Sequence, residues 1–162
     1  MNTIEEAKQF LRENFEDGCH CPCCGQNVKL YRRSINAGLA LFLIQFNKVW
    51  ECKTGDERLE GVHVSEIIGT NMVINGKNCS HYSTLMHWGL IQRVFKSDHE
   101  KVRTSGYWRL TDEGAAFVQN KLRVPKYVMT FDGTVESCSD NVLSIEECLG
   151  KDFDYRELIS HD

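Results

Sequence analysis

The stretch 83–121 constrains the fold more than any other part of the chain. It reads as a short helix, a strand, a polar loop, a second strand and a second helix. Ser83 can cap the first helix through its side-chain oxygen, and Gly89 can end that helix in the left-handed conformation. Two β-rich runs, 90–95 and 106–110, flank the polar loop. A helix that leads directly into a β-hairpin predicts an α+β fold in which the hairpin packs beside helices.

The segments before this stretch add further elements. Ser34 is expected to cap a helix at 35–50, which is apolar around most of its circumference and should be the central helix of the fold. Residues 54–61 carry loop signals. A short β-like run at 62–64 and a compressed helix at 65–69 follow. Three helices are therefore expected before the hairpin.

The residues Gly89-Leu-Ile, Gly106-x-Trp-x-Leu-Thr111, Gly114 and Phe117 resemble the recognition-helix and wing half of a winged-helix domain. The resemblance implies a winged-helix-like core of three helices and a β-hairpin wing. In such domains the third helix commonly enters the major groove of DNA, and the wing touches phosphate or the minor groove. Nucleic acid is therefore the default partner.

Segments on both sides of this core suggest a division of the chain. Thr3 and Glu6 have the spacing of a capping box at the start of an amphipathic helix. Val124-Pro125 marks a boundary, Asp132-Gly133 favours a hairpin turn, and Ser144 begins another capping box. We expect three parts: an N-terminal helix and zinc knuckle at 1–33, the winged-helix domain at 34–123, and an acidic hairpin with a short helix at 124–162.

Four of the eight cysteines lie between Cys19 and Cys24. Cys21-Pro-Cys-Cys24-Gly25 matches a CPxCG zinc knuckle, in which two thiolates three positions apart bind one tetrahedral Zn²⁺. A reduced cysteine cluster without metal is the plainer alternative. A redox pair would need a helix that begins at its first cysteine, and Pro-Cys-Cys-Gly is a poor helix start. We expect a structural zinc held by Cys21 and Cys24.

A structural zinc needs four ligands, and the sequence contains no second pair with this spacing. His63 and His87 are the preferred second pair, because they would tie the knuckle to the helical core. Cys79 with His81 is the rival pair. The neighbouring residues Cys19, His20 and Cys23 would strain so short a loop.

Catalytic motifs are absent from the sequence. It has no His-Glu-x-x-His zinc helix, no deaminase signature, no glycine-rich phosphate loop and no Gly-x-Ser-x-Gly elbow. We therefore expect a binding protein rather than an enzyme.

The net charge of −4 conceals a basic middle, 18–131, between acidic ends. This pattern is compatible with a polyanionic partner and equally with neutralisation by the acidic tail. The expected third helix has no Arg, Lys, Asn or Gln between Ser83 and Trp88, so it lacks the side chains that most often read bases. Weak or shape-based contact with nucleic acid is therefore expected, through Lys29, Arg32, Arg33, Ser83, Thr84, Arg93, Lys96, Lys101 and Arg103.

Longer motifs extend along nearly the whole chain, among them Cys21-Pro-x-Cys-Gly-Gln-x-Val-Lys-Leu-Tyr-Arg-Arg33 and Leu149-Gly-Lys-x-Phe-Asp-Tyr-Arg-Glu-Leu158. They make the chain resemble a group of small phage and prophage proteins. The resemblance implies a bacteriophage source and a nucleic-acid-binding regulator, or else an adaptor that binds or inhibits a host protein. The chain has no secretory signal at its start and no apolar run long enough to span a membrane, so we expect it in the cytoplasm, that of the host cell if it is phage-encoded. The oligomeric state stays open.

Overall fold

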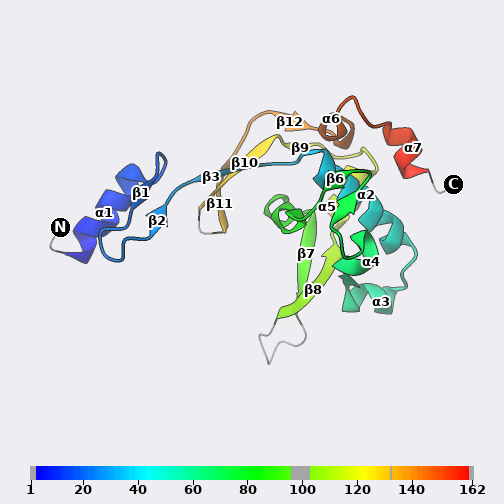
Figure 1. The fold of residues 1–162 in the computed structure, drawn as a ribbon, viewed down its shortest axis with the longest axis horizontal. Coiled ribbons are helices and arrows are strands. Elements are labelled where there is room, and N and C mark those ends of the chain that lie inside the picture. The colour runs from blue at the N-terminus through cyan, green and yellow to red at the C-terminus, as the bar shows by residue number, and fades with distance from the viewer. Residues whose placement is uncertain (1–2, 96–102, 132, 161–162) are drawn as a thin grey trace. The chain divides into compact units, whose positions relative to one another are not determined.

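The computed structural model describes residues 3–95, 103–131 and 133–160. The chain, which Figure 1 colours by residue number, divides into two compact units. The small unit consists of Met1–Ser34 and Tyr127–Ser139, and the large unit of Ile35–Lys126 and Asp140–Asp162.

The small unit begins with the expected helix, α1 (Ile4–Asn14), and its Thr3–Glu6 capping box is present. A two-residue hairpin follows, in which β1 (Cys19–His20) pairs with β2 (Asn27–Val28). The expected C-terminal hairpin forms from β10 (Tyr127–Phe131) and β11 (Thr134–Cys138). An unpredicted strand, β3 (Tyr31–Ser34), pairs with β10 and completes an antiparallel sheet of order β11-β10-β3.

The core of the small unit is thin. Among its described residues, only Ala7, Val128 and Thr130 are buried. Phe15 of α1 and Phe131 of β10 meet edge to face, with their ring centroids 5.4 Å apart. One aromatic pair and three buried side chains give this unit little hydrophobic stabilisation.

The large unit is built around α2 (Ala37–Glu51), which is buried along most of its length. The predicted cap at Ser34 is wrong. Asn36 is the N-cap, and its Oδ1 accepts a hydrogen bond of 2.9 Å from the backbone N–H of Leu39. Ser34 instead pairs with Tyr127 as the last residue of β3. A strand partner far along the chain therefore decided where the helix begins.

The loop expected at 54–61 is also wrong in part, because α3 (Gly55–Glu60) forms there. Thr54 and Glu57 make a capping box at its start. Gly55, between them, had been interpreted as a loop signal. The next expected elements form as β4 (Val62–His63) and α4 (Val64–Ile68). A small hairpin then follows, made of β5 (Val73–Ile74) and β6 (Lys77–Asn78).

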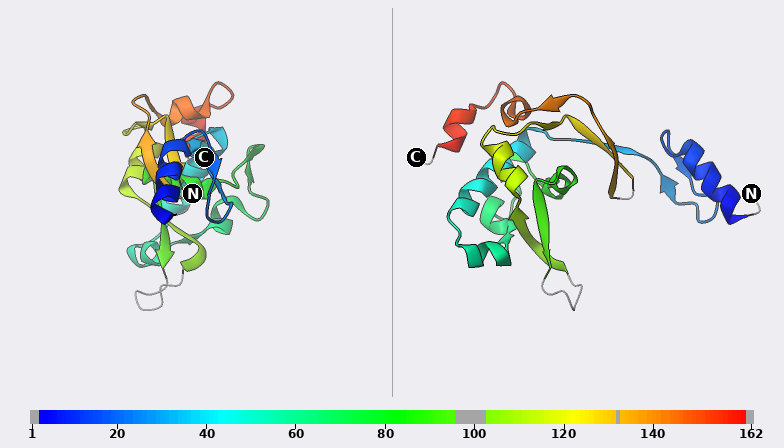
Figure 2. Two further views of the ribbon diagram at one scale, coloured as in Figure 1. Left: turned by 90° about the vertical axis from the view of Figure 1, so that its left-hand side faces the viewer. Right: turned by 180° about the vertical axis from the view of Figure 1, so that it is seen from behind.

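The stretch that begins at 83 forms a 3₁₀ helix, a β-hairpin and an α-helix. The predicted cap at Ser83 is wrong, because the 3₁₀ helix η1 (Tyr82–Trp88) begins one residue earlier and has no side-chain cap. Gly89 ends it in the left-handed conformation as expected. Strands β7 (Ile91–Phe95) and β8 (Arg103–Leu110) lie side by side in every view (Figure 2), and β4 pairs with the other edge of β8. The sheet order is therefore β4-β8-β7, and Thr111 caps the closing helix α5 (Asp112–Val118).

The segment after α5 is shared between the two units, whereas a single appendage at 124–162 had been expected. β9 (Val124–Pro125) pairs with β12 (Val142–Leu143) in the large unit. Helices α6 (Ile145–Leu149) and α7 (Tyr155–Ile159) follow there, and Ser144 caps α6 as predicted. Only the β10–β11 hairpin belongs to the small unit.

The predicted α+β class is confirmed, since the described residues form both helices and strands and the strands pair antiparallel. The core of the large unit joins α2, α4, α5 and α6 to the β4-β8-β7 sheet through side chains such as Phe42, Val62 and Phe117. None of the helices in the described ranges is long and apolar enough to cross a membrane.

Candidate functional sites: a cysteine hairpin and a basic β-hairpin

The Cys21–Gly25 segment forms the tip of the β1–β2 hairpin. The backbone N–H of Cys21 donates to the carbonyl of Gln26 at 2.8 Å, and the N–H of Gly25 donates to the carbonyl of Cys21 at 2.8 Å. Gly25 has a φ of 76°, which an L side chain rarely adopts. The two backbone bonds and this glycine close the turn that carries Cys21 and Cys24.

Backbone amides face the sulfur of Cys21. Hydrogen bonds from the N–H groups of Cys24 and, to a lesser degree, Cys23 lower the pKa of the Cys21 thiol below its ordinary value. Hydrogen bonds to the charged form of a group stabilise that form. The turn therefore makes the Cys21 thiol easier to deprotonate, and thiolate is the form of cysteine that binds metal.

The other side chains of the hairpin do not complete a metal site. His20 Nδ1 lies 3.2 Å from the carbonyl oxygen of Gly25, so its ring is held against the turn. Across the described parts of the chain, no three His, Cys, Asp or Glu side chains gather where one ion could be held. Cys21 and Cys24 therefore lie together in one turn, and their binding of zinc stays a prediction.

His63, predicted as a zinc ligand, lies in the large unit and caps α4. Its Nδ1 accepts a hydrogen bond of 3.1 Å from the N–H of Ser65 and lies 2.8 Å from the Ser65 hydroxyl. Its Nε2 faces Gly106 so closely that a Cβ there would lie 2.7 Å away. Nδ1 is therefore used as the cap of α4, and metal binding by Nε2 stays a prediction.

The remaining predicted ligands also lie in the large unit. His87 is half-buried in η1. The rival ligand Cys79 is buried, its Sγ–H donates to the carbonyl of Gly38 at 3.2 Å, and burial raises its pKa. A neutral, hydrogen-bonded thiol is a poor zinc ligand, so Cys79 and His81 make a weak alternative pair.

The helix expected to read bases is packed into the large unit. Tyr82 stacks on Phe42 with ring centroids 5.1 Å apart, and Leu85 is fully buried. The predicted contact residues Ser83 and Thr84 are half-buried, and the Thr84 hydroxyl donates to the carbonyl of His81 at 2.8 Å. Few polar groups of η1 are free to contact a ligand.

The predicted cations of the β7–β8 hairpin differ in how far the structure describes them. Arg93 lies with its guanidinium 5.4 Å from the centre of the Trp108 ring, so its stem and head are partly covered. Lys96 and Lys101 lie outside the described residues, as does the side chain of Arg103. Arg109, near the end of β8, donates hydrogen bonds from its guanidinium to the carbonyl of Leu59.

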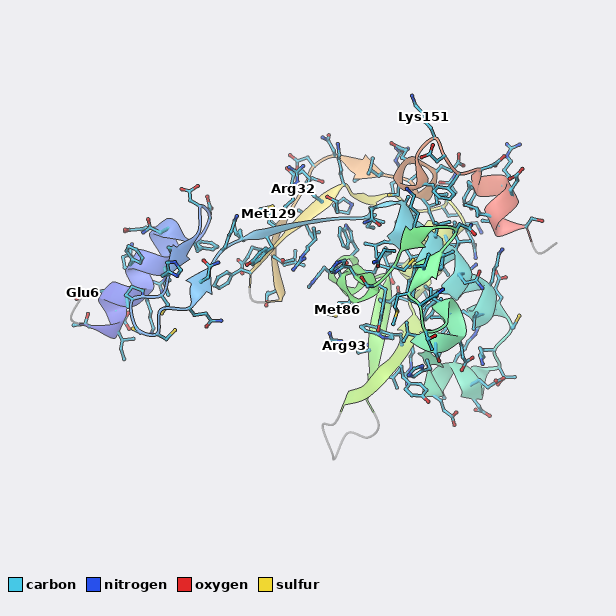
Figure 3. All side chains as sticks on the ribbon, viewed as in Figure 1. Glu6, Arg32, Met86, Arg93, Met129 and Lys151 are labelled. Carbon is cyan, nitrogen blue, oxygen red and sulfur yellow. The ribbon has the colours of Figure 1, made fainter. Side chains whose placement is uncertain are left out.

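The predicted cations of the small unit lie on or next to β3. Arg32 sits over the ring of Tyr127 at 4.0 Å from its centre, next to Met129 on the paired strand (Figure 3). Arg33 lies 5.4 Å from the centre of the Tyr31 ring, and Lys29 is exposed. Cations stacked on aromatic rings are held in place and keep their charge.

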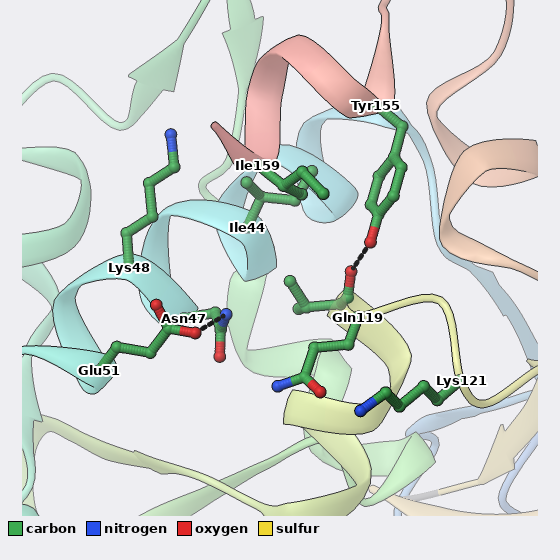
Figure 4. Close-up of a pocket in the computed structure, with 9 residues that line it drawn as sticks. Ile44, Asn47, Lys48, Glu51, Gln119, Lys121, Tyr155 and Ile159 are labelled. Carbon is green, nitrogen blue, oxygen red and sulfur yellow. Dashed lines mark hydrogen bonds between the residues drawn. The ribbon is translucent and has the colours of Figure 1, made fainter. Parts of the chain in front are cut away.

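A cavity of about 310 Å³ in the large unit was missed by the sequence analysis (Figure 4). The hydroxyl of Tyr155 donates to the carbonyl of Val118 at 2.5 Å and fixes α7 as one wall. Burial, and to a lesser extent the charge of Glu146, raises the pKa of Tyr155. The other side chains are mixed in character, and α7 had not been predicted as a helix. The lining comprises Ile44, Asn47, Lys48, Glu51, Val118, Gln119, Lys121, Tyr155 and Ile159.

Comparison of the chain with protein-family models, with characterised proteins and with solved structures gives no match in any of the three.

Proposed function

We propose that this protein is a zinc-stabilised winged-helix protein of bacteriophage origin that binds nucleic acid as a regulator. One observation carries the winged-helix part of the proposal. The antiparallel sheet has the order β4-β8-β7, and η1 leads through Gly89 directly into β7. In a winged helix, three helices precede the hairpin and a first strand pairs with its far edge. Here α2, α4 and η1 precede the β7–β8 hairpin, and β4, between α2 and α4, pairs with β8.

The hairpin is the proposed contact surface. Side chains of η1 are largely used in packing or in bonds to their own turn, whereas Lys96, Lys101 and Arg103 follow one another at and beyond the end of β7. Asp98 and Glu100 fall in the same stretch, so the excess of positive charge is small. Binding through phosphate, with modest affinity and little base readout, is what these residues support.

The zinc has a structural role in this proposal. The small unit has three buried side chains among its described residues, and units with so little core are commonly stabilised by a metal, disulfides or oligomerisation. Cys21 and Cys24 supply a pair of ligands at the tip of its hairpin.

Fluorescence polarisation tests the nucleic-acid proposal. Duplex and single-stranded DNA of mixed sequence are titrated with the protein at several salt concentrations. If Lys96, Lys101 and Arg103 each neutralise one phosphate, the slope of log K against log salt is about −3 for duplex DNA. The triple variant Lys96→Ala/Lys101→Ala/Arg103→Ala should lose most of this slope.

A matched variant controls for the loss of charge. Lys77, Lys126 and Lys151 are exposed elsewhere on the large unit, and replacing all three with alanine removes the same charge. This control should bind like the unaltered protein. An equal loss of DNA affinity in both triple variants would overturn the proposed contact surface. No DNA binding at low salt would overturn nucleic acid as the partner.

A protein partner is the second candidate, and the apolar surface of the small unit favours it. Ile4 of α1 is 69% exposed, and a cavity of about 290 Å³ beside α1 is lined by Leu11, Phe15 and Phe131 among others. Exposed apolar surface of this kind is typical of protein-binding sites. Absence of DNA binding at low salt, together with recovery of a host protein that Ile4→Asp abolishes, would favour the adaptor.

A further inference from the structure

The tip of the β1–β2 hairpin carries two of the four ligands that a structural zinc needs. Structural zinc in proteins is held by four ligands in a tetrahedron. Cys21 and Cys24 provide two, and among the described residues no third His, Cys, Asp or Glu gathers with them. His63 uses Nδ1 to cap α4, and the buried Cys79 thiol donates a hydrogen bond to the carbonyl of Gly38. A second copy of the chain can supply the other pair of ligands.

The tip of the hairpin is open to a second molecule. Residues 22–26 are all exposed, and Cys21 is partly exposed. No Lys, Arg, Asp or Glu occurs between Gly18 and Val28. Two copies of this tip can therefore approach without like-charge repulsion, and the copies can be related by a twofold axis through the metal.

The small unit also has reason to associate. Its described residues include only three buried side chains, Ala7, Val128 and Thr130, for a helix, a two-stranded hairpin and a three-stranded sheet. A shared metal would stabilise two such units at once, because zinc binding free energy becomes folding free energy where the site is not formed in the unfolded chain.

We propose that one Zn²⁺ joins two copies of this chain, with Cys21 and Cys24 of each copy as its four ligands. The inference rests on the zinc part of the proposed function and names the source of the missing ligands. Each of the four thiols gives up its proton to solvent as its sulfur binds the metal, so the site carries a net charge of about −2 when four thiolates hold one Zn²⁺. Backbone N–H groups of Cys23 and Cys24 lie at the sulfur of Cys21 and offset part of that charge.

The test uses the full chain, freed of metal, under a reductant that does not bind zinc. Zinc is titrated while light scattering after size-exclusion chromatography gives the mass and elemental analysis gives the metal content. The expected result is a rise in mass from one chain, 18.6 kDa, to two, complete at one zinc for two chains. A chelator should return the protein to the mass of one chain.

Three variants separate this site from other thiols. Cys21→Ser/Cys24→Ser should stay monomeric and take up no zinc. Cys23→Ser, in the same turn, and Cys138→Ser, on an exposed strand of the same unit, should dimerise like the unaltered protein. Neither of these two controls removes a proposed ligand.

The outcomes distinguish the inference from the function on which it rests. One zinc per monomeric chain, lost in Cys21→Ser/Cys24→Ser, would overturn the shared site and leave the zinc knuckle in place. No zinc uptake would overturn both. The salt dependence of DNA binding is measured separately, so nucleic-acid binding stands or fails by its own experiment.

Discussion

The indole Nε1 of Trp88 donates a hydrogen bond of 2.9 Å to the backbone carbonyl of Pro125. The bond joins the last residue of η1 to β9, which lies 37 positions along the chain. With Tyr82 stacked on Phe42, it anchors both ends of η1 to the large unit. Because η1 is held at both ends, we assign it a structural role. The proposed contact with nucleic acid is therefore placed on the β7–β8 hairpin.

Trp88→Phe should destabilise the protein without changing its affinity for DNA. The variant keeps most of the apolar surface but leaves the Pro125 carbonyl without this donor, which costs about 1–2 kcal/mol. Urea unfolding measures the loss, and fluorescence polarisation measures the affinity. A tenfold loss of affinity at unchanged stability would instead make Trp88 a contact residue.

His63→Ala should destabilise the large unit and leave the zinc content unchanged. The substitution removes the N-cap of α4, at a typical cost of about 1 kcal/mol. Asn is among the best N-cap residues, so His63→Asn should retain more of the stability. Thermal unfolding and elemental analysis of the two variants together separate a cap from a ligand. Loss of zinc in both variants at unchanged stability would restore His63 as a metal ligand.

Gly114→Ala should be strongly destabilising although alanine favours helices. A Cβ at position 114 would collide with the backbone carbonyl oxygen of Leu90, at the point where α5 crosses the start of β7. We expect a loss of about 1–3 kcal/mol or more, because backbone must move to make room. Gly55→Ala is the matched control. Its Cβ would meet no atom within 4 Å, so unfolding measurements should show it neutral or slightly stabilising.

Cys148 should react slowly with alkylating reagents. Burial, and the neighbouring charge of Glu147 to a lesser degree, raise its pKa from 9.0 to about 11. A rise of this size lowers the thiolate fraction at neutral pH about 100-fold, and thiolate is the reactive form. Iodoacetamide labelling followed by mass spectrometry should therefore modify the exposed Cys52 well before Cys148. Equal rates for the two thiols would contradict the burial of Cys148.

The same shift gives a pH dependence of stability. Because the folded pKa of Cys148 is raised, its contribution to the free energy of unfolding is present below pH 9.0 and is lost as the pH rises toward 11. The free energy of unfolding measured in urea should therefore fall more steeply with pH over this range in the unaltered protein than in Cys148→Ala. If the free energy of unfolding depended on pH in the same way in both proteins, the raised pKa of Cys148 would not be the cause of the pH dependence.

Local signals predicted most of the helices. Capping boxes at Thr3 and Ser144, and the left-handed glycine at Gly89, are present as expected because each depends on residues only a few positions apart. The same local logic missed α3, where Gly55 read as a loop although Thr54 and Glu57 form a capping box. The 3₁₀ form of η1 was not predicted either, since its tight packing depends on Phe42 and Pro125.

Long-range pairings account for what the sequence could not predict. The strand β3 exists because Tyr127–Phe131 lies beside it, and nothing near Tyr31–Ser34 announces that partner. The spacing of Cys21 and Cys24 predicted that they share one turn, whereas the role of His63 as the N-cap of α4 was not predicted. Its Nδ1 accepts a hydrogen bond from the N–H of Ser65, two positions away, and β8 brings the backbone of Gly106 close to the ring.

The small unit is assembled from the first part of the chain and from a late insertion, 127–139. During synthesis, the β1–β2 hairpin can close as soon as it emerges, because its partners lie within ten residues of one another. The edge of β3 must wait until β10 has been made, after most of the large unit. An unpaired edge invites pairing with other chains while it waits. Because this sheet can close only after β10 has been made, the time taken to synthesise the large unit sets how long the β3 edge stays unpaired.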